Sequence, residues 1–329
     1  MDKGMEGSGG ARGEPVQRDV AVSILMSTFK RAIVLRETLE SMAAMQPPGC
    51  NWELLCVDNS GDQETKSVVA EFKSLLPVRY LVERKRGKNA ALNAGIRGAR
   101  GAVLVFTDDD VTVDEDWLRE LKAGFERWPD AAVFGGRIVP RFPTGVAPYE
   151  LRSILTKAAF VEADWGIPEG YYSPLRVWGP NMAVRSTVFD RGFRFDESVG
   201  PSGEDYANGS ETSFVLEVAR QGFEPVYLPG ALVHHRIRPE QMTLKWLKGR
   251  AFRAGRGAAR RQEIERAKLW LGVPRYLYRA IVEAWIAWAW SSVWRKDESA
   301  RVERLMQFHH CRGRIHELRS SGRSGARKS

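Results

Sequence analysis

The chain contains few residues of the types that build metal or disulfide frameworks. It has three cysteines and five histidines among 329 residues. The cysteines, Cys50, Cys56 and Cys311, are odd in number, and their spacing matches no zinc framework. We interpret them as structural thiols of a protein in a reducing compartment.

Long hydrophobic runs are also missing from the sequence. No apolar run reaches the ~18 residues of an uninterrupted membrane span. The first 19 residues are rich in Gly, Glu and Arg and have no apolar signal region. We expect residues 1–19 to be a disordered lead-in and the protein to be cytoplasmic.

The overall composition is that of a globular protein with a strong positive charge. Apolar residues make up 43% of the chain and aromatic residues 10%, which is sufficient for a packed core. The net charge is +9. Such a charge favours an anionic partner, which can be nucleic acid, an anionic membrane surface or a phosphorylated substrate.

The first half of the chain alternates between strand and helix patterns. This alternation predicts an α/β fold with a mostly parallel sheet flanked by helices. Asp114 is a candidate N-cap of the last helix in this half. The expected strands are 20–26, 52–57, 78–82, 102–106 and 131–134, and the expected helices are 31–45, 62–75, 88–97 and 114–127.

The second half is less regular. Residues 140–178 are rich in Pro, Gly and aromatic residues and predict a long functional loop or short helices. We expect most of the chain beyond Pro239 to be helical. The other expected elements are a strand near 181–184, a helix at 211–221, a strand pair at 225–228 and 232–235, a basic stretch at 248–261 and a Trp-rich stretch at 276–294.

Polar clusters follow three of the predicted strands. They are Ser27-Thr28, Asp58-Asn59 and Asp108 to Asp110. Ligands of such sheets bind beyond the carboxyl ends of the strands, so these clusters predict a site. Three adjacent aspartates repel one another unless a cation compensates them, and Mg²⁺ or Mn²⁺ binds carboxylates together with substrate phosphates. The alternative is an exposed acidic turn that caps the next helix.

Other charged residues permit two interpretations each. The basic run from Arg84 to Lys88 precedes a helix and forms either an anion site or a solvated loop. Glu211, in the first turn of a helix, is either a catalytic base or a complement to the helix dipole. The pair Glu204-Asp205 is a rival for the role of base. His234-His235 ends a strand and is either structural or a contact to metal or phosphate.

Several motifs occur in the order found in a known family. They are Val22-Ser-Ile-Leu-Met-Ser-Thr-Phe-Lys-Arg31, Leu54-Leu-Cys-Val-Asp-Asn59, Gly87-Lys-Asn-Ala-Ala-Leu-Asn-Ala-Gly95, Val105-Phe-Thr-Asp-Asp-Asp110, Gly179-Pro-Asn-Met-Ala183, Gly209-Ser-Glu-Thr212 and Leu232-Val-His-His235. With these motifs, residues 20–240 resemble the inverting glycosyltransferases of family 2, which have the GT-A fold.

The resemblance implies roles for individual residues. Glu211 is the expected catalytic base, in place of the aspartate that the family often carries, and this register favours it over Asp205. The expected nucleotide-sugar contacts are Ser27, Thr28, Phe29, Arg31, Asp58, Lys88, Asp108 and Asp109. Asp110, Asp108 and His235 are the expected ligands of Mn²⁺ or Mg²⁺, although a run of three aspartates allows two registers of the motif. The acceptor side is expected to contain Gly136, Trp178, Gly179 and Asn181, with contributions from Trp165 and Tyr171.

The activity implied by the resemblance is transfer of a sugar from a nucleoside diphosphate donor, with UDP as the first choice, to a saccharide or lipid-linked acceptor in cell-envelope polysaccharide or glycolipid synthesis. A nucleotidyltransferase is one alternative, but Ser27 to Lys30 stands where such enzymes carry a Gly-rich phosphate loop. A nucleic-acid-binding protein is another, but the basic residues do not cluster with aromatics in a recognition module, so no nucleic acid is expected. A catalytically dead sugar-nucleotide sensor is disfavoured because all the acids that the chemistry needs are present.

The expected domains are a nucleotide-sugar-binding half at 20–138, an acceptor half at 139–240 and a basic, Trp-rich helical region at 241–329. Arg279 and Glu283 interrupt the Trp-rich stretch and argue against a bilayer span. Tryptophans flanked by Arg and Lys suit a helix in a membrane interface, so the protein could attach peripherally to the inner face of the cell membrane. The alternative is that these tryptophans pack against the catalytic domain.

Overall fold

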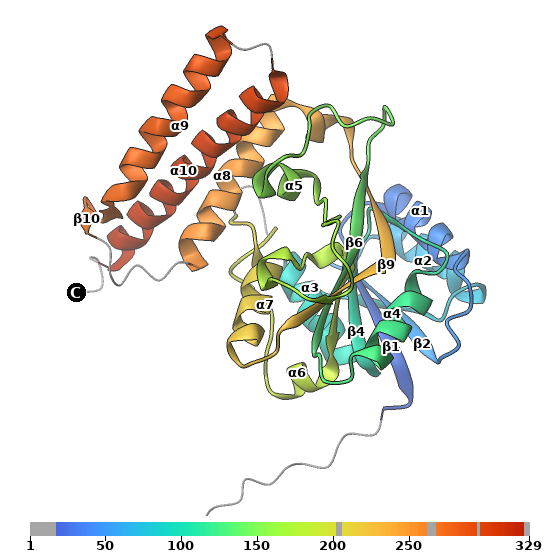
Figure 1. The fold of residues 1–329 in the computed structure, drawn as a ribbon. Helices are drawn as coiled ribbons and strands as arrows, with labels where there is room; N and C mark the ends of the chain where they lie inside the picture. Colours follow the sequence, from blue (N-terminus) through green and yellow to red (C-terminus); the bar gives the residue numbers. More distant parts are fainter. Residues whose placement is uncertain (1–17, 202–205, 262–267, 295–296, 326–329) are drawn as a thin grey trace, which may run out of the picture.

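The computed structural model describes residues 18–201, 206–261, 268–294 and 297–325. Most of the predicted lead-in and the rival acids Glu204 and Asp205 lie outside the described residues. The described chain forms a sheet flanked by helices, with three further helices at one side (Figure 1). The predicted α/β architecture is confirmed.

The sheet has a parallel half and a mixed half. Its strand order is β3-β2-β1-β4-β8-β6-β9-β5, with β7 paired to β9. The parallel half consists of β3 (Val78–Val82), β2 (Trp52–Asp58), β1 (Val20–Thr28) and β4 (Gly101–Asp108). The mixed half consists of β8 (Met182–Arg185), β6 (Val133–Arg141), β9 (Pro225–Arg236), β5 (Val111–Val113) and β7 (Gly170–Tyr171).

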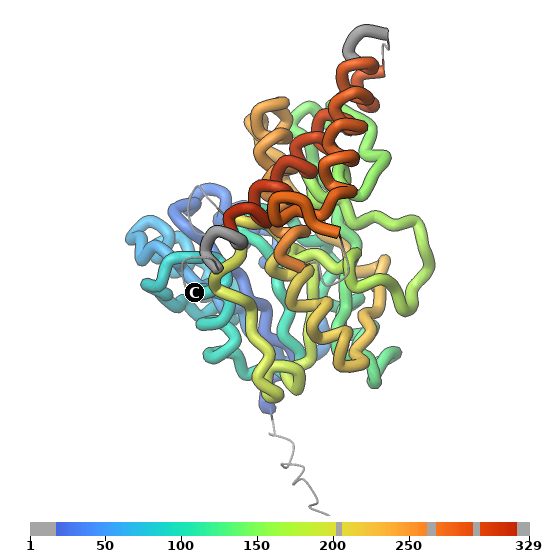
Figure 2. Tube along the Cα trace, turned by 90° about the vertical axis from the view of Figure 1, so that its left-hand side faces the viewer, coloured from blue at the N-terminus to red at the C-terminus, as the bar shows by residue number. Residues whose placement is uncertain are grey.

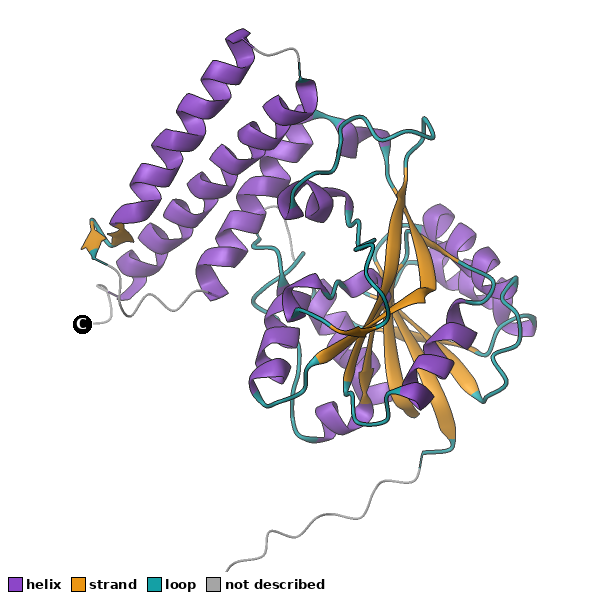
Figure 3. Cartoon of the chain, in the orientation of Figure 1, coloured by secondary structure: helices purple, strands orange, loops and turns teal. Residues whose placement is uncertain are grey.

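Helices cover both faces of the sheet (Figure 3). One face packs on α1 (Ala32–Ala43), α2 (Gln63–Glu71) and α4 (Trp117–Arg127) through a large buried apolar cluster. The other face packs on α3 (Lys88–Gly98), α6 (Ser186–Asp190) and α7 (Ser210–Arg220) through a second cluster. Alternate residues of β1 supply the two clusters, with Ile24 on one face and Leu25 on the other, as the two-residue period of a strand requires.

Two sequence predictions about element boundaries were wrong. The expected strand pair at 225–228 and 232–235 is the single strand β9. The register of β9 against β6 shifts beside Gly136, so the intervening residues form a bulge rather than a turn. Asp114 does not cap α4. Asp116 occupies the N-cap position, and the Asp114 side chain accepts a hydrogen bond from the Asp116 backbone N–H at 3.2 Å.

The C-terminal region is a layer of three helices, α8 (Leu244–Arg261), α9 (Arg275–Trp294) and α10 (Glu298–Gly325), as Figures 1 and 2 show. A hairpin of β10 (Leu269–Trp270) and β11 (Val273–Pro274) precedes α9. Helix α10 contacts both α8 and α9. No helix in the described parts of the chain is both long and apolar enough to cross a membrane.

The contact between α8 and the catalytic domain is apolar. Leu247 and Ala251 of α8 belong to a buried cluster with Phe142 and Phe160. Phe160 ends α5 (Ile154–Phe160), a helix in the segment that the sequence marks as irregular. The predicted boundary after residue 240 therefore falls where the chain is packed continuously.

Helices α8 and α10 approach closely through a pair of glycines. A Cβ atom added at Gly255 would lie 2.0 Å from the backbone oxygen of His310, and one at Gly313 would lie 2.0 Å from that of Phe252. Because both neighbours are helix backbone, a methyl group cannot be accommodated without separating the helices.

We therefore expect Gly255→Ala to destabilise the protein by about 1–3 kcal/mol, despite the better helix propensity of alanine. Thermal unfolding measures the change. Gly249→Ala in the same helix is the control, because the nearest atoms to a Cβ there belong to the end of one side chain, the Arg253 guanidinium, at 3.2 Å or more, and not to backbone. A Gly255→Ala protein that melts at or above the wild-type temperature contradicts the prediction.

Candidate active site

The polar clusters that follow the strands meet at one edge of the sheet. In the parallel register, Thr28 lies beside Asp58, and Ser27 lies beside Asp108. The convergence predicted from the sequence is confirmed. Two cavities open at this edge, and we name them the edge cavity and the inner cavity.

The edge cavity has a volume of about 480 Å³ and lies over the ends of β1 and β4. The Phe29 side chain is 42% exposed, and the Arg86 guanidinium lies 6.0 Å from its ring centre. The residues that line the edge cavity are Ser27, Thr28, Phe29, Arg31, Asn59, Arg86, Gly87, Lys88, Asp108, Asp109, Asp110 and Pro201. Seven of the eight predicted nucleotide-sugar residues are thus together.

Asp58 is the exception. Its carboxylate is fully buried and lines neither cavity. It accepts hydrogen bonds from the backbone N–H groups of Ser60 and Asp62 and from the Tyr80 hydroxyl, at 2.7–2.9 Å. These bonds use both carboxylate oxygens to hold the loop after β2, and the neighbouring Asn59 lines the edge cavity instead.

The three aspartates of the acid cluster have different environments. Asp109 accepts hydrogen bonds from the Thr28 hydroxyl at 2.7 Å and from Arg31 at 2.6 Å. Burial raises the pKa of Asp109 to about 6, although Arg31 opposes this shift. Asp110 is also buried, yet His235 and Arg31 hold its pKa below the usual value. Asp108 and Asp110 line both cavities, whereas Asp109 lines only the edge cavity.

His235, on β9, lies next to Asp110, the last residue of the acid cluster. The His235 Nε2 atom lies 3.5 Å from Asp110 Oδ1, and Nδ1 lies 3.3 Å from the backbone oxygen of Phe160. A histidine whose Nδ1–H faces a carbonyl presents Nε2 as a ligand, which is the usual arrangement in metal sites. Within the described ranges, no three His, Cys, Asp or Glu side chains are placed to hold a metal ion together. A bound ion must take further ligands from substrate or water.

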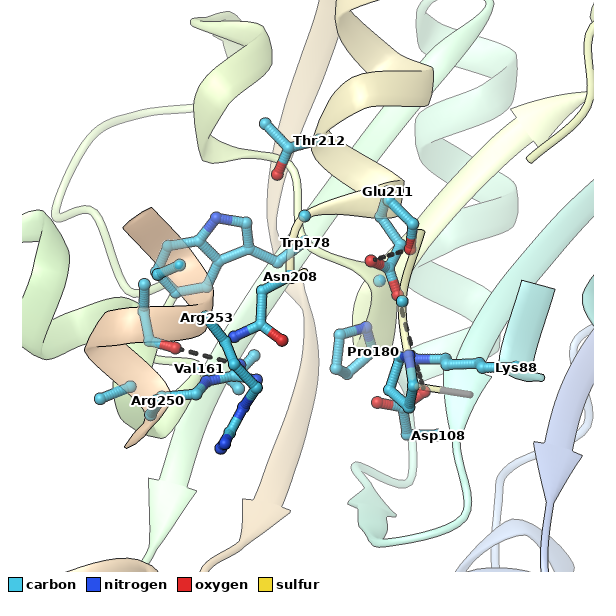
Figure 4. A pocket seen from close by; sticks show the side chains of 18 of the residues that line it. Lys88, Asp108, Val161, Trp178, Pro180, Asn208, Glu211, Thr212, Arg250 and Arg253 are labelled. Atoms are coloured by element: carbon cyan, nitrogen blue, oxygen red, sulfur yellow. Dashed lines mark hydrogen bonds and ion pairs between the residues drawn. The ribbon is translucent and has the colours of Figure 1, made fainter. Parts of the chain in front are cut away.

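Lys88 links the acid cluster to α7 (Figure 4). It is the first residue of α3, after Gly87 in the left-handed region with φ 129°. Its Nζ lies 2.6 Å from Asp108 Oδ1 and 3.0 Å from Glu211 Oε1. Although burial opposes the charge, the two carboxylates raise the pKa of Lys88.

Glu211 is the second residue of α7, which begins after Gly209 with φ +98°. Its carboxylate also accepts a hydrogen bond from the Ser210 hydroxyl at 2.8 Å. Burial opposes ionisation, but Lys88, a backbone N–H and Ser210 lower the pKa of Glu211 to about 2. At neutral pH this side chain is a carboxylate.

The inner cavity joins Glu211 to the C-terminal region. It has a volume of about 500 Å³ and shares Arg31, Lys88, Asp108 and Asp110 with the edge cavity. Glu211 and His235 also line it. Its other walls come from α5, from the loop before α7 and from α8.

Two of the four predicted acceptor residues line the inner cavity, namely Trp178 and Gly179. Gly179 is required there, because a Cβ would lie 2.8 Å from Glu211 Oε1. Asn181 does not line it. Its Nδ2 donates to two backbone carbonyls at 2.8–2.9 Å, and its Oδ1 accepts from the indole of Trp117. Gly136 lies outside it as well and leaves room for Asn181, since a Cβ would be 2.2 Å from Nδ2.

Trp165 and Tyr171, which were expected to contribute to the acceptor side together with Trp178, do not line the inner cavity. The Trp165 ring packs edge-on against Trp178 with 5.2 Å between ring centres but does not line the cavity. Tyr171 packs against Trp128, away from the site. Both side chains support the fold of the loop region rather than the cavity wall.

Helix α8 contributes to the inner cavity, which the sequence did not predict. Arg250, Arg253 and Arg261 line the inner cavity together with Trp246 and Tyr206. The spacing of these arginines, i, i+3 and i+11, places them on one helix face. That spacing was readable in the sequence, but nothing in it indicated that the face turns toward Glu211.

Comparisons with known proteins agree with this geometry. The model of the family described as "Glycosyl transferase family 2" matches residues 23–191. Among curated proteins, the chain is 24% identical to a glucosyl-dolichyl phosphate glucuronosyltransferase of Haloferax volcanii, over 71% of this chain and 75% of that protein. It is 28% identical to the succinoglycan biosynthesis protein ExoM of Rhizobium meliloti, over 71% and 72%.

Solved structures share the fold. The mannosyltransferase PcManGT of Pyrobaculum calidifontis, in complex with GDP-Man and Mn²⁺, aligns over 93% of this chain and 91% of that one, with a TM-score of 0.60 and 18% identity. Residues 1–349 of TarS from S. aureus, in complex with UDP-GlcNAc, align over 93% and 92%, with a TM-score of 0.52 and 16% identity.

The fold and the site together define an enzyme that transfers glycosyl groups, with the GT-A architecture. The family match covers just over half of the chain. The protein belongs to glycosyl transferase family 2, as its sequence motifs predict.

Lys88 supplies a prediction about pH. Without its cation, Asp108 and Glu211 repel each other, so we expect Lys88→Met to lose about 1–3 kcal/mol of stability at pH 7.5. Burial then raises the pKa of Glu211 above its usual value, so Glu211 takes up a proton as the pH falls. In the wild type, Glu211 stays ionised until the pH approaches 2. The stability gap between variant and wild type should therefore narrow from pH 7.5 to pH 4.5.

Urea unfolding at the two pH values measures this gap. Lys73→Met, at an exposed lysine, is the control and should give no gap at either pH. The double variant Lys88→Met/Glu211→Gln should be more stable at pH 7.5 than Lys88→Met alone. A gap that is constant or widens toward low pH contradicts the assignment.

Proposed function

We propose that the protein transfers a sugar from a nucleoside diphosphate donor to an acceptor hydroxyl with inversion at the anomeric carbon. The observation that carries the proposal is the Glu211 carboxylate, held by Lys88 beside Asp108 where the edge and inner cavities join. In this proposal the donor occupies the edge cavity and the acceptor enters through the inner cavity.

The donor contacts follow from the lining of the edge cavity. Ser27, Thr28 and Phe29 line the edge cavity and are the proposed nucleoside contacts, and Arg31 and Lys88 form ion pairs with the acid cluster. UDP is our first choice of nucleotide. Likeness to structures that hold GDP-Man and UDP-GlcNAc supports a nucleoside diphosphate without selecting the base.

The transfer needs a base on the acceptor side. The acceptor oxygen attacks the anomeric carbon, Glu211 takes the hydroxyl proton, and the bond between that carbon and the diphosphate oxygen breaks. Glu211 is a weak base while Lys88 holds its pKa at about 2. A donor diphosphate competes with Glu211 for Lys88. Loss of the Lys88 contact raises the pKa of Glu211, because the Glu211 side chain stays buried.

Asp110 and His235 fit a divalent cation, with Asp108 as a third candidate. The observation that supports the fit is the buried His235 imidazole, whose Nε2 lies 3.5 Å from Asp110 Oδ1 while its Nδ1 faces the backbone oxygen of Phe160. Mn²⁺ or Mg²⁺ bound there would neutralise the charge that develops on the departing diphosphate. The complex of PcManGT with Mn²⁺ supports a divalent cation.

The proposed acceptor is a saccharide or a lipid-linked molecule of cell-envelope polysaccharide or glycolipid synthesis. The names of two relatives support this class, since one is a glucosyl-dolichyl phosphate glucuronosyltransferase and the other a succinoglycan biosynthesis protein. We propose residues 20–138 as the donor half and 139–240 as the acceptor half, with α8 completing the acceptor cavity.

The C-terminal region is the proposed contact with an anionic membrane surface on the inner face of the cell membrane. Residues 241–329 contain 21 Lys and Arg against 7 Asp and Glu, a net charge of +14, whereas residues 1–240 have a net charge of −5. Helix α9 exposes Val282, Trp285, Ile286 and Trp290, whose spacing puts them on one face. Apolar aromatic side chains within a basic region suit the lipid headgroup layer.

A thermal-shift screen tests the proposed reaction. We expect one UDP-, GDP- or dTDP-sugar to stabilise the protein in the presence of Mn²⁺ or Mg²⁺, with the shift reduced by a chelator. Glu211→Gln should retain this shift and reduce sugar transfer, or slow donor hydrolysis, by at least about a hundredfold, because it removes the base and keeps the shape.

Glu217→Gln is the control, since Glu217 lies on the same helix, is exposed, and pairs only with Arg220 among the residues described. Failure of every nucleotide-sugar to stabilise the protein contradicts donor binding. Undiminished turnover of Glu211→Gln contradicts its role and returns Asp205 to candidacy.

Liposome co-sedimentation tests the membrane contact. We expect binding to vesicles that contain phosphatidylglycerol and weaker binding to neutral vesicles. The double variant Trp285→Glu/Ile286→Glu should bind roughly tenfold more weakly, because it removes apolar burial and adds repulsion. Leu75→Glu, at an exposed leucine of the catalytic domain, is the control. Equal binding of all three proteins contradicts the proposal.

A further inference from the structure

The α8 wall of the inner cavity carries a cluster of positive charges that the proposed chemistry does not use. Arg250, Arg253 and Arg261 line the cavity from one helix face, and Arg250 and Arg253 are visible beside Asn208 in Figure 4. None of the three forms an ion pair with a described carboxylate, in contrast to Arg256 and Arg260 of the same helix, which both pair with Glu317 at 2.6 Å.

Two buried hydrogen-bond donors in this wall lack an acceptor. Arg253 Nε and Asn208 Nδ2 are both inaccessible to solvent, and neither has a hydrogen-bond partner in the part of the chain that the structure describes. Buried donors are nearly always satisfied in folded proteins, and two such donors that line one cavity indicate a missing acceptor. Arg253 is held in place by the ring of Tyr206, 5.1 Å from its guanidinium carbon.

The electrostatics of the wall agree with a missing anion. Burial, together with the neighbouring Arg253 charge, holds the pKa of Arg250 below its ordinary value, and burial does the same for Arg261. The hydrogen bonds that Arg250 and Arg261 donate within the described chain are long bonds to backbone carbonyls, at 3.4–3.5 Å, and the Arg250 guanidinium lies 5.9 Å from the Trp246 ring centre. The Glu211 and Asp108 charges oppose the shift of Arg250 without cancelling it, so the guanidinium cluster is costly unless an anion binds to it.

The cluster is fixed relative to Glu211 by the docking of α8. The backbone N–H of Asn208 donates to the backbone oxygen of Arg253 at 3.1 Å. A Cβ at Gly257 would lie 1.7 Å from the backbone oxygen of Asn208, so only glycine allows this approach. Asn208 is three residues before Glu211, so the arginines and the proposed base belong to one rigid junction.

We propose that Arg250, Arg253 and Arg261 bind a phosphate or diphosphate group that the acceptor carries. Arginine is suited to this role because its planar fork matches phosphate oxygens. The arginines line the inner cavity and are absent from the lining of the edge cavity, whereas Ser27, Thr28 and Phe29 line only the edge cavity. The inference rests on the proposed function, because it assigns the two cavities to acceptor and donor. The acceptor class is then a phosphate ester of a lipid or of a sugar.

Calorimetric titration tests the inference on the full chain. The protein is first saturated with Mn²⁺ and the nucleotide that stabilises it, and then titrated with geranyl phosphate or with glucose 1-phosphate. Geraniol and glucose are the uncharged matches. We expect one or both phosphate esters to bind and the alcohols to bind at least tenfold more weakly. The tighter ester identifies a lipid or a sugar as the carrier.

Arg253→Gln should weaken the phosphate ester at least tenfold and leave nucleotide affinity within about twofold. Arg250→Gln is an independent second variant. Lys245→Gln is the control, because it removes one charge from an exposed position of the same helix. Unchanged melting temperatures of the ligand-free variants establish that they fold.

Three results overturn the inference: no ester binds to the wild-type protein, ester affinity is the same in Arg253→Gln and wild type, or nucleotide affinity falls as much as ester affinity. The last result assigns the arginines to the donor diphosphate. A protein that binds no nucleotide refutes the donor site instead. In that case the esters are titrated into nucleotide-free protein. The comparison of wild type, Arg253→Gln and Lys245→Gln then tests the phosphate site independently of the donor site.

Discussion

The bridge from Lys88 to Asp108 and Glu211 is the interaction on which the site depends. It joins the end of β4 to the start of α7, two elements separated by about a third of the chain. One cation lies between two carboxylates, whose charges repel each other in its absence. The same pairing makes Glu211 a poor base in the ligand-free protein. A donor diphosphate that competes for Lys88 would therefore bind and raise the basicity of Glu211 in one event.

Much of the edge cavity was predictable from the sequence, because it is built from local patterns. Strands β1, β2 and β4 are apolar runs that end at Thr28, Asp58 and Asp108, and parallel pairing brings such ends to one edge. Where the cavity lining departs from the predicted set of residues, the cause is a side-chain direction. Asp58 has the right position in its strand, but its carboxylate turns back to the N–H groups of its own loop. A strand pattern predicts the position of a residue in the sheet, but it does not predict which groups its side chain contacts.

The inner cavity and its surroundings depend on contacts that no local pattern encodes. Asn181 belongs to a sequence motif that predicts a ligand contact. Its amide instead donates to two backbone carbonyls that are distant in the sequence, and it fits there only because Gly136 has no side chain. Strand β9 pairs in parallel with β6 from far along the chain, and its Pro-Gly pair forms a bulge rather than a turn. The arginines of α8 are recognisable as one helix face, but their direction is set by Gly255 and Gly257, where backbones approach closely.

The distribution of these features divides the enzyme into two parts with different constraints. The family match ends at residue 191, whereas Glu211, His235 and the α8 arginines all lie beyond it. The shared part holds the residues proposed to contact the nucleoside and the acid cluster. The remainder carries the α8 wall and the positive charge of the chain. If acceptor choice resides there, relatives that use other acceptors should keep Lys88 and the acid cluster while they replace Arg250 and Arg253, and the glycine contacts of α8 should change together with the arginines that they orient.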